Sequence, residues 1–302
     1  MVISFLHHRL CYTFCMSTIR TLPQSEFPPL LAEIPQPPKE LWLEGALPRA
    51  ELKLLAVVGS RKYTTYGKQV VEHLMAGLAG YPIGIISGLA LGIDSLAHEA
   101  ALSHGLYTMA VPGSGLDQSV LYPPTHKRLA RRIIEAGGGL LSEFEPTLPA
   151  ARWTFTQRNR IMAGMCQATL LIEAAPESGT LITARMAVDY NRELLVVPGS
   201  IFSKTSLGTH QFLKLGATPV TAAADILAVL GIEVIEPSIT KLRPATLSPQ
   251  ESHVLDLLHE PTDRDTLCRQ LNLPANEAGV LLMQMEINGH ITTEGNKYRT
   301  VI

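Results

Sequence analysis

The chain lacks the excess of basic residues that usually marks a nucleic-acid-binding protein. Lysine and arginine total 25 against 27 aspartates and glutamates in 302 residues, so the formal net charge is −2. Any polyanion therefore has to be held by a local basic cluster, not by the field of the whole molecule. Long hydrophobic runs are also lacking. No segment approaches the roughly 18 apolar residues of a membrane span, so we expect no membrane association.

Cysteine is scarce as well. The cysteines are Cys11, Cys15, Cys166 and Cys268, and they form no CxxC pair and have no histidine at zinc-ligand spacing. We therefore expect no metal site. Free thiols in a chain of this size are typical of a reducing compartment, which predicts a cytoplasmic protein.

A targeting segment is not expected at the N-terminus. Its apolar stretch is interrupted by His7, His8 and Arg9, and no small-residue cleavage site follows, which argues against a signal peptide. Met16 followed by serine and threonine resembles a start, which would make residues 1–15 an extension of the native chain.

Proline content and periodicity divide the chain into four parts. Residues 1–50 are expected to form a Pro-rich N-terminal lead without much regular structure. Residues 51–231 show the pattern of an α/β domain, residues 232–246 that of a linker, and residues 247–302 that of a small compact unit.

Short apolar runs alternate with segments of helical spacing through the α/β part. The predicted strands are Leu54–Val58, Ile83–Ile86, Tyr107–Val111, Gly139–Ser142, Ala168–Glu173, Glu193–Val197 and Thr218–Val220, with a short edge strand at 41–43. The predicted helices are Lys68–Ala79, Ser95–His104, Pro124–Ala136, Asn159–Met165, Leu181–Tyr190 and Thr209–Leu215. This alternation predicts an extended Rossmann-like, doubly wound and mostly parallel sheet. Ligands of such folds bind beyond the carboxyl ends of the strands.

The last part predicts three helices and a hairpin. The helices are expected at Val254–His259, Thr262–Leu271 and Pro274–Asn288, and the strands at Ile291–Thr293 and Lys297–Val301, around Gly295-Asn296. Three helices followed by a two-stranded wing predict a winged-helix domain.

Two strand-to-glycine-to-helix junctions point to anion binding. The first is LLAVVGSRKYTTYG (Leu54–Gly67) and the second is IGIISGLALGIDSLAH (Ile83–His98). Each directs backbone N–H groups and the positive end of a helix at one place, which suits phosphate. Arg61 stands in the first junction, where a guanidinium can hold a phosphate bidentately. A single junction of this kind is weak, because every doubly wound fold needs tight turns there.

Two further segments strengthen the case. Residues 152–160 place three arginines among Trp153 and Phe155 just before a predicted helix, and arginine with an aromatic face is the minimal chemistry of single-strand binding. Glu177–Thr180 adds a third glycine-bearing helix start. The ordinary alternatives are that the two aromatic residues belong to the core and that Asp94 caps a helix.

No catalytic set stands out. The sequence contains no GxSxG elbow, no GxxxxGK[ST] loop and no HExxH motif, so binding is expected, not catalysis.

The motifs resemble those of the DNA-processing protein DprA (Smf) family. They are GSR at Gly59–Arg61, SGLALGIDSLAH at Ser87–His98, VPGSGLDQSVLYPPTH at Val111–His126, LLSE at Leu140–Glu143, RNRIMAGM at Arg158–Met165, IEAAPESGTLITAR at Ile172–Arg185 and VVPGSIFSKTSLGTHQFLKLGATPV at Val196–Val220. The resemblance covers residues 28–230 in order, and the C-terminal part resembles the winged-helix domain of many members.

The resemblance implies a function. Members bind single-stranded DNA, form homodimers through the Rossmann domain, need no nucleotide cofactor, and load RecA recombinase onto incoming DNA in natural transformation. By alignment, the phosphate-contacting arginine falls on Arg61, and the basic and aromatic strand-binding residues fall on Arg152 and Phe155. The full set of expected DNA contacts is Gly59, Ser60, Arg61, Ser87, Gly88, Arg152, Phe155, Arg158, Asn159, Arg160, Ser178, Gly179 and Thr180.

The chain departs from the family pattern in three ways. Leu91 stands where many members have arginine or lysine, and the N-terminal helical domain of many relatives is absent or reduced to the lead. Between Thr240 and Ile302, six basic residues oppose eight acidic ones. Because a DNA-reading wing is usually basic, this balance favours a protein-interaction or stabilising role.

Two other functions stay open. Related Rossmann proteins of the LOG group hydrolyse nucleoside monophosphates with a PGGxGTxxE loop. The corresponding loop here, PESGTLITAR, has Thr183 in place of the glutamate, which argues against hydrolysis. A paralogue that serves DNA repair or uptake without competence would have the same sequence features.

Overall fold

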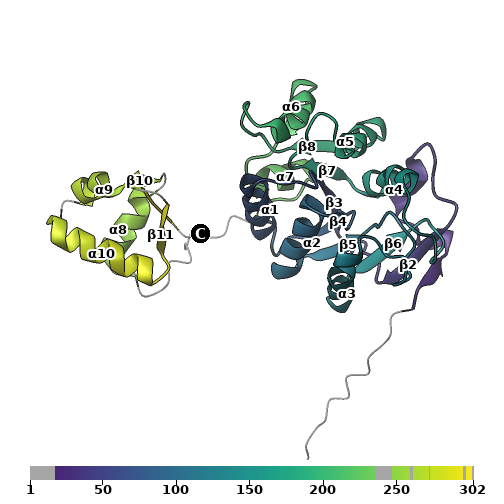
Figure 1. Cartoon of the computed structure of the whole chain (residues 1–302), viewed down its shortest axis with the longest axis horizontal. Coiled ribbons are helices and arrows are strands. Elements are labelled where there is room, and N and C mark those ends of the chain that lie inside the picture. Colours follow the sequence, from purple (N-terminus) through teal and green to yellow (C-terminus); the bar gives the residue numbers. More distant parts are fainter. Residues whose placement is uncertain (1–17, 235–246, 259–260, 272, 295–296, 301–302) are drawn as a thin grey trace, which may run out of the picture. The chain divides into compact units, whose positions relative to one another are not determined.

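The computed structural model describes residues 18–234, 247–258, 261–271, 273–294 and 297–300. The chain divides into two compact units, Met1–Val234 and Ile235–Ile302 (Figure 1). Most of the predicted linker, residues 235–246, lies outside the described residues.

A nine-stranded sheet forms the centre of the first unit. Its strands are β1 (Arg20–Leu22), β2 (Leu41–Gly45), β3 (Lys53–Val58), β4 (Ile83–Ser87), β5 (Tyr107–Ala110), β6 (Gly139–Ser142), β7 (Ala168–Leu171), β8 (Glu193–Val196) and β9 (Thr218–Pro219). They lie in the order β1-β2-β6-β5-β4-β3-β7-β8-β9, and all neighbours from β6 to β9 are parallel. The chain winds outward in both directions from β3, so the crevice expected of a doubly wound fold lies between β3 and β7.

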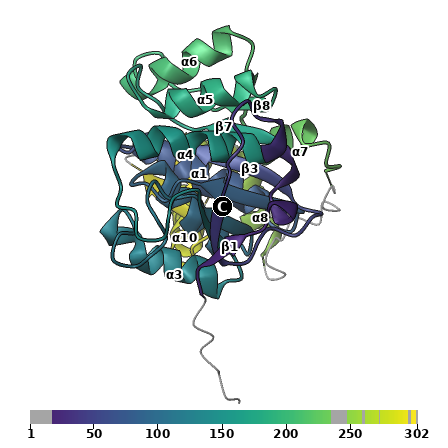
Figure 2. The ribbon, with the colours of Figure 1, turned by 90° about the vertical axis from the view of Figure 1, so that its right-hand side faces the viewer.

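Helices cover both faces of this sheet. They are α1 (Thr65–Gly77), α2 (Ile93–Ser103), α3 (Lys127–Glu135), α4 (Arg152–Met165), α5 (Thr180–Asp189), α6 (Leu207–Lys214) and α7 (Ala223–Val229). In Figure 1, α1 and α2 lie on the opposite side of β3 and β4 from α4. Figure 2 shows α5 and α6 together at the β8 end. The mostly parallel, doubly wound fold is as predicted.

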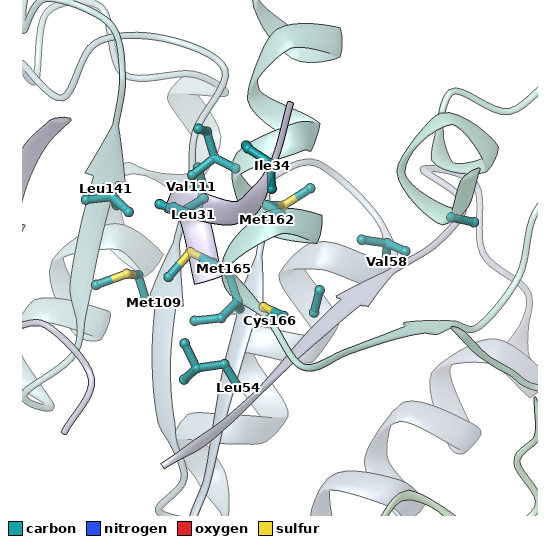
Figure 3. Packing of buried hydrophobic residues seen from close by; sticks show 14 of the residues in the cluster. Leu31, Ile34, Leu54, Val58, Met109, Val111, Leu141, Met162, Met165 and Cys166 are labelled. Atoms are coloured by element: carbon teal, nitrogen blue, oxygen red, sulfur yellow. The ribbon is translucent and has the colours of Figure 1, made fainter. Parts of the chain in front are cut away.

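The side chains of β3 explain why both faces are covered. Leu54 and Val58 pack with the α4 side, whereas Leu55 and Val57 pack with the α1 and α2 side. Because successive side chains of a strand point to opposite faces, a continuous apolar run needs a core on each. Figure 3 shows the α4-side core from close by.

Residues 18–50 were predicted to form a lead with little regular structure apart from an edge strand at 41–43, but they contribute two strands to the sheet of the α/β domain. β2 pairs antiparallel with β6 and β1 pairs with β2, so β1 and not β2 is the edge strand. Leu31 and Ile34 are buried against α4 (Figure 3). A Cβ added at Gly164 of α4 would lie 2.8 Å from Ile34 Cγ2, so this glycine lets the lead approach the helix closely.

Helix α7 was not predicted. Its alanine-rich sequence gives no clear apolar periodicity, so the helix is marked mainly by its cap. The Asp225 carboxylate accepts hydrogen bonds from the backbone N–H groups of Thr221, at 2.7 Å, and Ala222, at 3.0 Å. These bonds satisfy donors that a helix start leaves free.

The second unit is a winged helix, as predicted. It contains α8 (Pro249–Leu257), β10 (Thr262–Asp263), α9 (Arg264–Leu271), α10 (Ala275–Ile287), β11 (Ile291–Glu294) and β12 (Lys297–Thr300), with the strands in the order β10-β12-β11. The third helix and the hairpin follow the prediction closely. The second helix begins later than predicted, because Thr262 and Asp263 pair with β12 and the Asp263 carboxylate caps α9 through the Thr266 N–H, at 2.9 Å.

Two features are absent from the part of the chain that the structure describes. Within the described ranges, no helix is long and apolar enough to cross a membrane. Nor do the described histidines, cysteines, aspartates and glutamates form a group of three or more that could hold a metal ion.

Candidate nucleic-acid interface

A pocket of about 810 Å³ opens at the carboxyl ends of β3 and β7, at the crevice between these two strands. The first and third glycine junctions and one face of α4 line it. The predicted contacts found in its lining are Gly59, Ser60, Arg61, Phe155, Arg158, Asn159, Ser178, Gly179 and Thr180. The structure therefore brings together nine residues predicted from three separate segments.

The GSR loop after β3 is held by its own backbone and one hydroxyl. The Ser60 N–H donates to the carbonyl of Glu173, at 2.7 Å. The Ser60 hydroxyl accepts from the Lys62 N–H, at 3.0 Å, and donates to the Lys62 carbonyl, at 2.8 Å. These bonds fix the loop, so the exposed Arg61 side chain projects from a rigid support.

The second junction packs against the first and supports it. The Ile93 N–H donates to the Ser60 carbonyl, at 3.1 Å. Gly92 has a φ of +93°, and a Cβ there would lie 2.6 Å from Arg61 Cα; a Cβ at Gly59 would lie 2.6 Å from Ile93 Cγ1. Both positions therefore need glycine, because only a missing Cβ lets the two loops touch.

The third junction is tied to the first by hydroxyls. The Thr180 hydroxyl donates to the Gly59 carbonyl, at 3.0 Å, and accepts from the Ser178 hydroxyl, at 2.9 Å. The Ser178 hydroxyl also accepts from the Thr180 N–H, at 3.3 Å. Both hydroxyls are therefore used in hydrogen bonds that hold the wall of the pocket together.

Arg61 lies over the ring of Phe155, with its guanidinium carbon 5.3 Å from the ring centroid. Tyr122 meets the same ring edge-on, at 5.6 Å between centroids. A Cβ at Gly113 would lie 2.7 Å from Phe155 Cε1, so glycine there makes room for the ring. A cation and an aromatic ring thus share one place, as the sequence predicted, and the cation covers one face of the ring.

Helix α4 begins at Arg152, seven residues before the predicted start. Ala151 is extended, and the Thr154 hydroxyl accepts from its N–H, at 3.0 Å, and donates to the Gly113 carbonyl, at 2.6 Å. Helical spacing therefore decides which residues of this segment face the pocket. Arg152 is exposed in the first turn and shares the face of Phe155, three residues on, but it lies outside the pocket lining.

Arg160 does not face the pocket, and its predicted DNA contact is corrected. Its guanidinium forms an ion pair with Glu143 and donates to the Gln36 carbonyl of the lead. The exposed side-chain fractions are 11% for Arg160 and 6% for Glu143. Burial raises the pKa of Glu143, and the charge of Arg160 opposes this rise. Arg160 is a structural residue that joins α4 to the lead.

Ser87 and Gly88 are also corrected. Ser87 is fully buried and its hydroxyl donates to the Val57 carbonyl, at 2.7 Å. The Gly88 N–H donates to the Asp94 carboxylate, at 3.1 Å. Because Asp94 occupies this amide, the second junction supports the pocket and does not offer its first N–H to an anion.

Arg158 lines the pocket but is buried. Its guanidinium donates to the Val111 carbonyl, and burial lowers its pKa to about 10, opposed by the charge of Asp94. Burial raises the pKa of Asp94, opposed by Arg158. The opposite charges of Arg158 and Asp94 offset each other in the buried part of the lining, which leaves Arg61 and Lys62 as its exposed cations.

Sequence reasoning missed two contributors. Lys62 lines the pocket beside Arg61, and its position in the GSRK loop was a signal that could have found it. Glu173 is buried just after β7, where its carboxylate accepts from the Thr64 N–H, at 2.9 Å, the Thr64 hydroxyl, at 2.6 Å, and the Thr205 hydroxyl, at 3.0 Å. It anchors the start of α1 and the loop before α6.

This geometry agrees with the comparisons with known proteins. A family model described as DNA recombination-mediator protein A matches residues 18–231, and one described as the DprA winged helix domain matches residues 240–297. The chain belongs to the DprA/Smf family. The matched range includes the lead, in line with its place in the sheet. The descriptions of the family and its relatives name a DNA recombination mediator and a DNA processing protein.

Curated DprA/Smf proteins are similar over much of their length. Protein Smf of Escherichia coli K12 is 36% identical over 285 residues, which cover 91% of this chain and 75% of that protein. The DNA processing protein DprA of Streptococcus pneumoniae R6 is 41% identical over 198 residues, which cover 66% of this chain and 69% of that protein.

Two solved DprA structures share the fold. The X-ray structure from Streptococcus pneumoniae matches with a TM-score of 0.65 and 37% identity, over 70% of this chain and 74% of that chain. The structure of DprA from Helicobacter pylori, which is described in terms of its single-stranded DNA binding mode, matches with a TM-score of 0.64 and 28% identity. The match covers 71% of this chain and 96% of that chain.

Proposed function

We propose that the chain binds single-stranded DNA in the pocket between β3 and β7 and acts as a recombination mediator. The observation that carries the proposal is Arg61 seated on Phe155 at the mouth of that pocket. A phosphate is a bidentate ligand for the guanidinium, and a base can stack on the guanidinium plane or on the ring. The Helicobacter pylori relative, whose structure concerns single-stranded DNA binding, supports the same ligand.

The wider role is part of the proposal. We place the protein in the cytoplasm, as a homodimer that loads a RecA recombinase onto incoming DNA in natural transformation. Support for self-association comes from the segment after β8, which exposes Ile201, Phe202, Leu207 and Leu215. Large apolar side chains gathered on a surface commonly mark a protein interface.

The hydrolase alternative loses support. Thr183 stands where the LOG-type loop has its glutamate, and it is buried. The hydroxyls of Ser178 and Thr180 are engaged with the pocket's own walls, so neither is free to take the place of that glutamate.

The central test is the Arg61→Ala variant, measured by fluorescence anisotropy on a short oligo-dT. A charge-assisted hydrogen bond contributes about 1.5–3 kcal/mol, so we expect affinity to fall by about tenfold or more. Arg131→Ala is the matched control, because Arg131 is exposed on α3 and does not line the pocket. Equal affinities for the two variants would show that the strand binds elsewhere.

A further inference from the structure

Helix α10 of the winged-helix unit carries an apolar stripe on its outer face. Val280, Met283 and Ile287 are 65%, 63% and 75% exposed. They are spaced three and four residues apart, so they lie on one face of the helix. The inner face, with Ala278, Leu282 and Met285, fills the core of the unit. The three residues of the outer stripe therefore do not belong to the hydrophobic core of the unit.

This face is unsuited to DNA. In three-helix variants of the helix-turn-helix fold the third helix enters the major groove, and a DNA-reading surface is usually basic. Residues 275–287 contain no lysine or arginine, and their charged residues are Glu277 and Glu286. The carboxylates would repel the phosphates of DNA, and the apolar side chains have few favourable partners in the largely polar floor of the major groove.

The stripe is self-complementary. Its residues are distributed nearly symmetrically about Met283, so two antiparallel copies place Val280 of one near Ile287 of the other at both ends. This is the isologous arrangement of a two-fold dimer. Antiparallel pairing also sets opposite ends of the helix dipoles side by side.

The flanking charges fit the same arrangement. Near the N-terminal end of the stripe, the Arg264 guanidinium lies over Gly279, where a Cβ would be 2.7 Å from one of its nitrogens. Glu286 lies at the other end and accepts from the Thr293 N–H, at 3.2 Å. Antiparallel copies bring Arg264 of one copy toward Glu286 of the other at each end, so opposite charges meet there.

We propose that α10 is a homotypic docking surface, on which the winged-helix unit of a second copy of this chain packs antiparallel through Val280, Met283 and Ile287. Three side chains make a small interface, below the area of most stable dimers. The contact is therefore weak by itself and is strengthened when another part of the two chains already holds them together, which raises the effective concentration of the units.

The test uses the full-length chain and a short bifunctional maleimide. Met283→Cys places a thiol at the centre of the stripe, Gln270→Cys places one at an exposed site on α9, and the unaltered chain gives the background from the native cysteines. We expect several-fold more cross-linked dimer from Met283→Cys than from Gln270→Cys. Equal yields would overturn the proposal, whatever the affinity for oligo-dT.

A charge exchange tests the antiparallel register. Val280→Lys in the Met283→Cys chain should reduce cross-linking to background, because it places a cation against Ile287 of the other copy. Adding Ile287→Glu should restore it, because each new cation then meets a new carboxylate across the interface. Circular dichroism checks that each variant is folded, as expected for exposed positions. Failure of the double change to restore cross-linking in folded protein would rule out the antiparallel pairing.

Discussion

Arg61 and Phe155 hold the central place in the site because they contact each other before any ligand arrives. The guanidinium lies over the ring, and the ring is held by Tyr122 and by the space left at Gly113. A DNA strand entering the pocket meets a cation that is already oriented, so binding loses less side-chain conformational entropy.

Because the two side chains touch, their contributions to binding should not add. In a double-mutant cycle with Arg61→Ala and Phe155→Ala, we expect a coupling energy of about 0.5–3 kcal/mol, measured as oligo-dT affinity. Trp153→Ala paired with Arg61→Ala is the control, because Trp153 is exposed outside the pocket lining and packs on Phe144. Additive effects in the first cycle would mean that the ring and the guanidinium act on DNA independently.

The buried ion pair between Arg160 and Glu143 leads to a prediction about the stability of the fold and its dependence on pH. Arg160→Met removes the partner of a buried carboxylate, which typically costs about 3–5 kcal/mol. Burial already raises the pKa of Glu143, and losing Arg160 raises that pKa further. A folded state that takes up a proton more readily than the unfolded chain gains stability as pH falls.

The stability deficit of Arg160→Met should therefore shrink between neutral pH and about pH 5, the range just above the ordinary carboxyl pKa. Urea unfolding of the variant and the unaltered chain at both pH values measures it. Oligo-dT affinity of the folded variant should stay close to that of the parent. A deficit that grows toward acid would contradict the assignment.

At the scale of elements, the site depends on loops pressed against one another. Gly92 opens α2 with a φ of +93° directly against the GSR loop. Gly105, at the end of the same helix, also has a positive φ, of +67°, but a Cβ there meets nothing within 4 Å. Substitutions at Gly92 and Gly105 therefore distinguish the cost of backbone strain alone from the cost of strain together with a disturbed contact between the loops.

We expect Gly105→Ala to cost about 1–2 kcal/mol of stability, the ordinary penalty for a left-handed residue with a Cβ, and to leave DNA binding unchanged. Gly92→Ala should cost more and also weaken oligo-dT binding, because its Cβ displaces Arg61. Thermal unfolding and anisotropy on both variants give the comparison. Identical behaviour of the two would mean that the loop contact does not position Arg61.

At the scale of the whole molecule, binding is local in a chain of net charge −2. Arg61 and Lys62 are the exposed cations of the pocket lining, with Arg152 exposed in the same helical segment as Phe155. At about −0.7 in log–log slope for each neutralised phosphate of a single strand, two or three contacts give a gentle salt dependence.

We therefore expect the logarithm of oligo-dT affinity to fall with the logarithm of salt with a slope between about −1.4 and −2 for a short oligonucleotide. Ending the chain after Val234 should leave this slope unchanged, because the winged-helix unit carries no excess of positive charge. A slope steeper than about −4 would show that cations outside the pocket dominate.

Patterns in the amino-acid sequence were enough to predict the strand-and-helix alternation and the three glycine junctions, and to place Arg61 in the first of them. Each of these depends on local chemistry: apolar runs, glycine at tight turns, and the rule that parallel strands end at one edge. The winged helix was predicted for the same reason, since its helices and hairpin are marked by residues close together in the chain.

The roles of the lead, of Arg160 and of Ser87 follow from contacts in the folded protein. Of the two strands of the lead, β1 was missed and β2 was predicted only as an edge strand, because its partner β6 lies far along the chain. Arg160 turns away from the pocket because α4 begins at Arg152, where the Thr154 hydroxyl accepts from the Ala151 N–H and donates to the Gly113 carbonyl. Ser87 is covered by strands on both sides. Each outcome is set by partners distant in sequence, which local patterns do not encode.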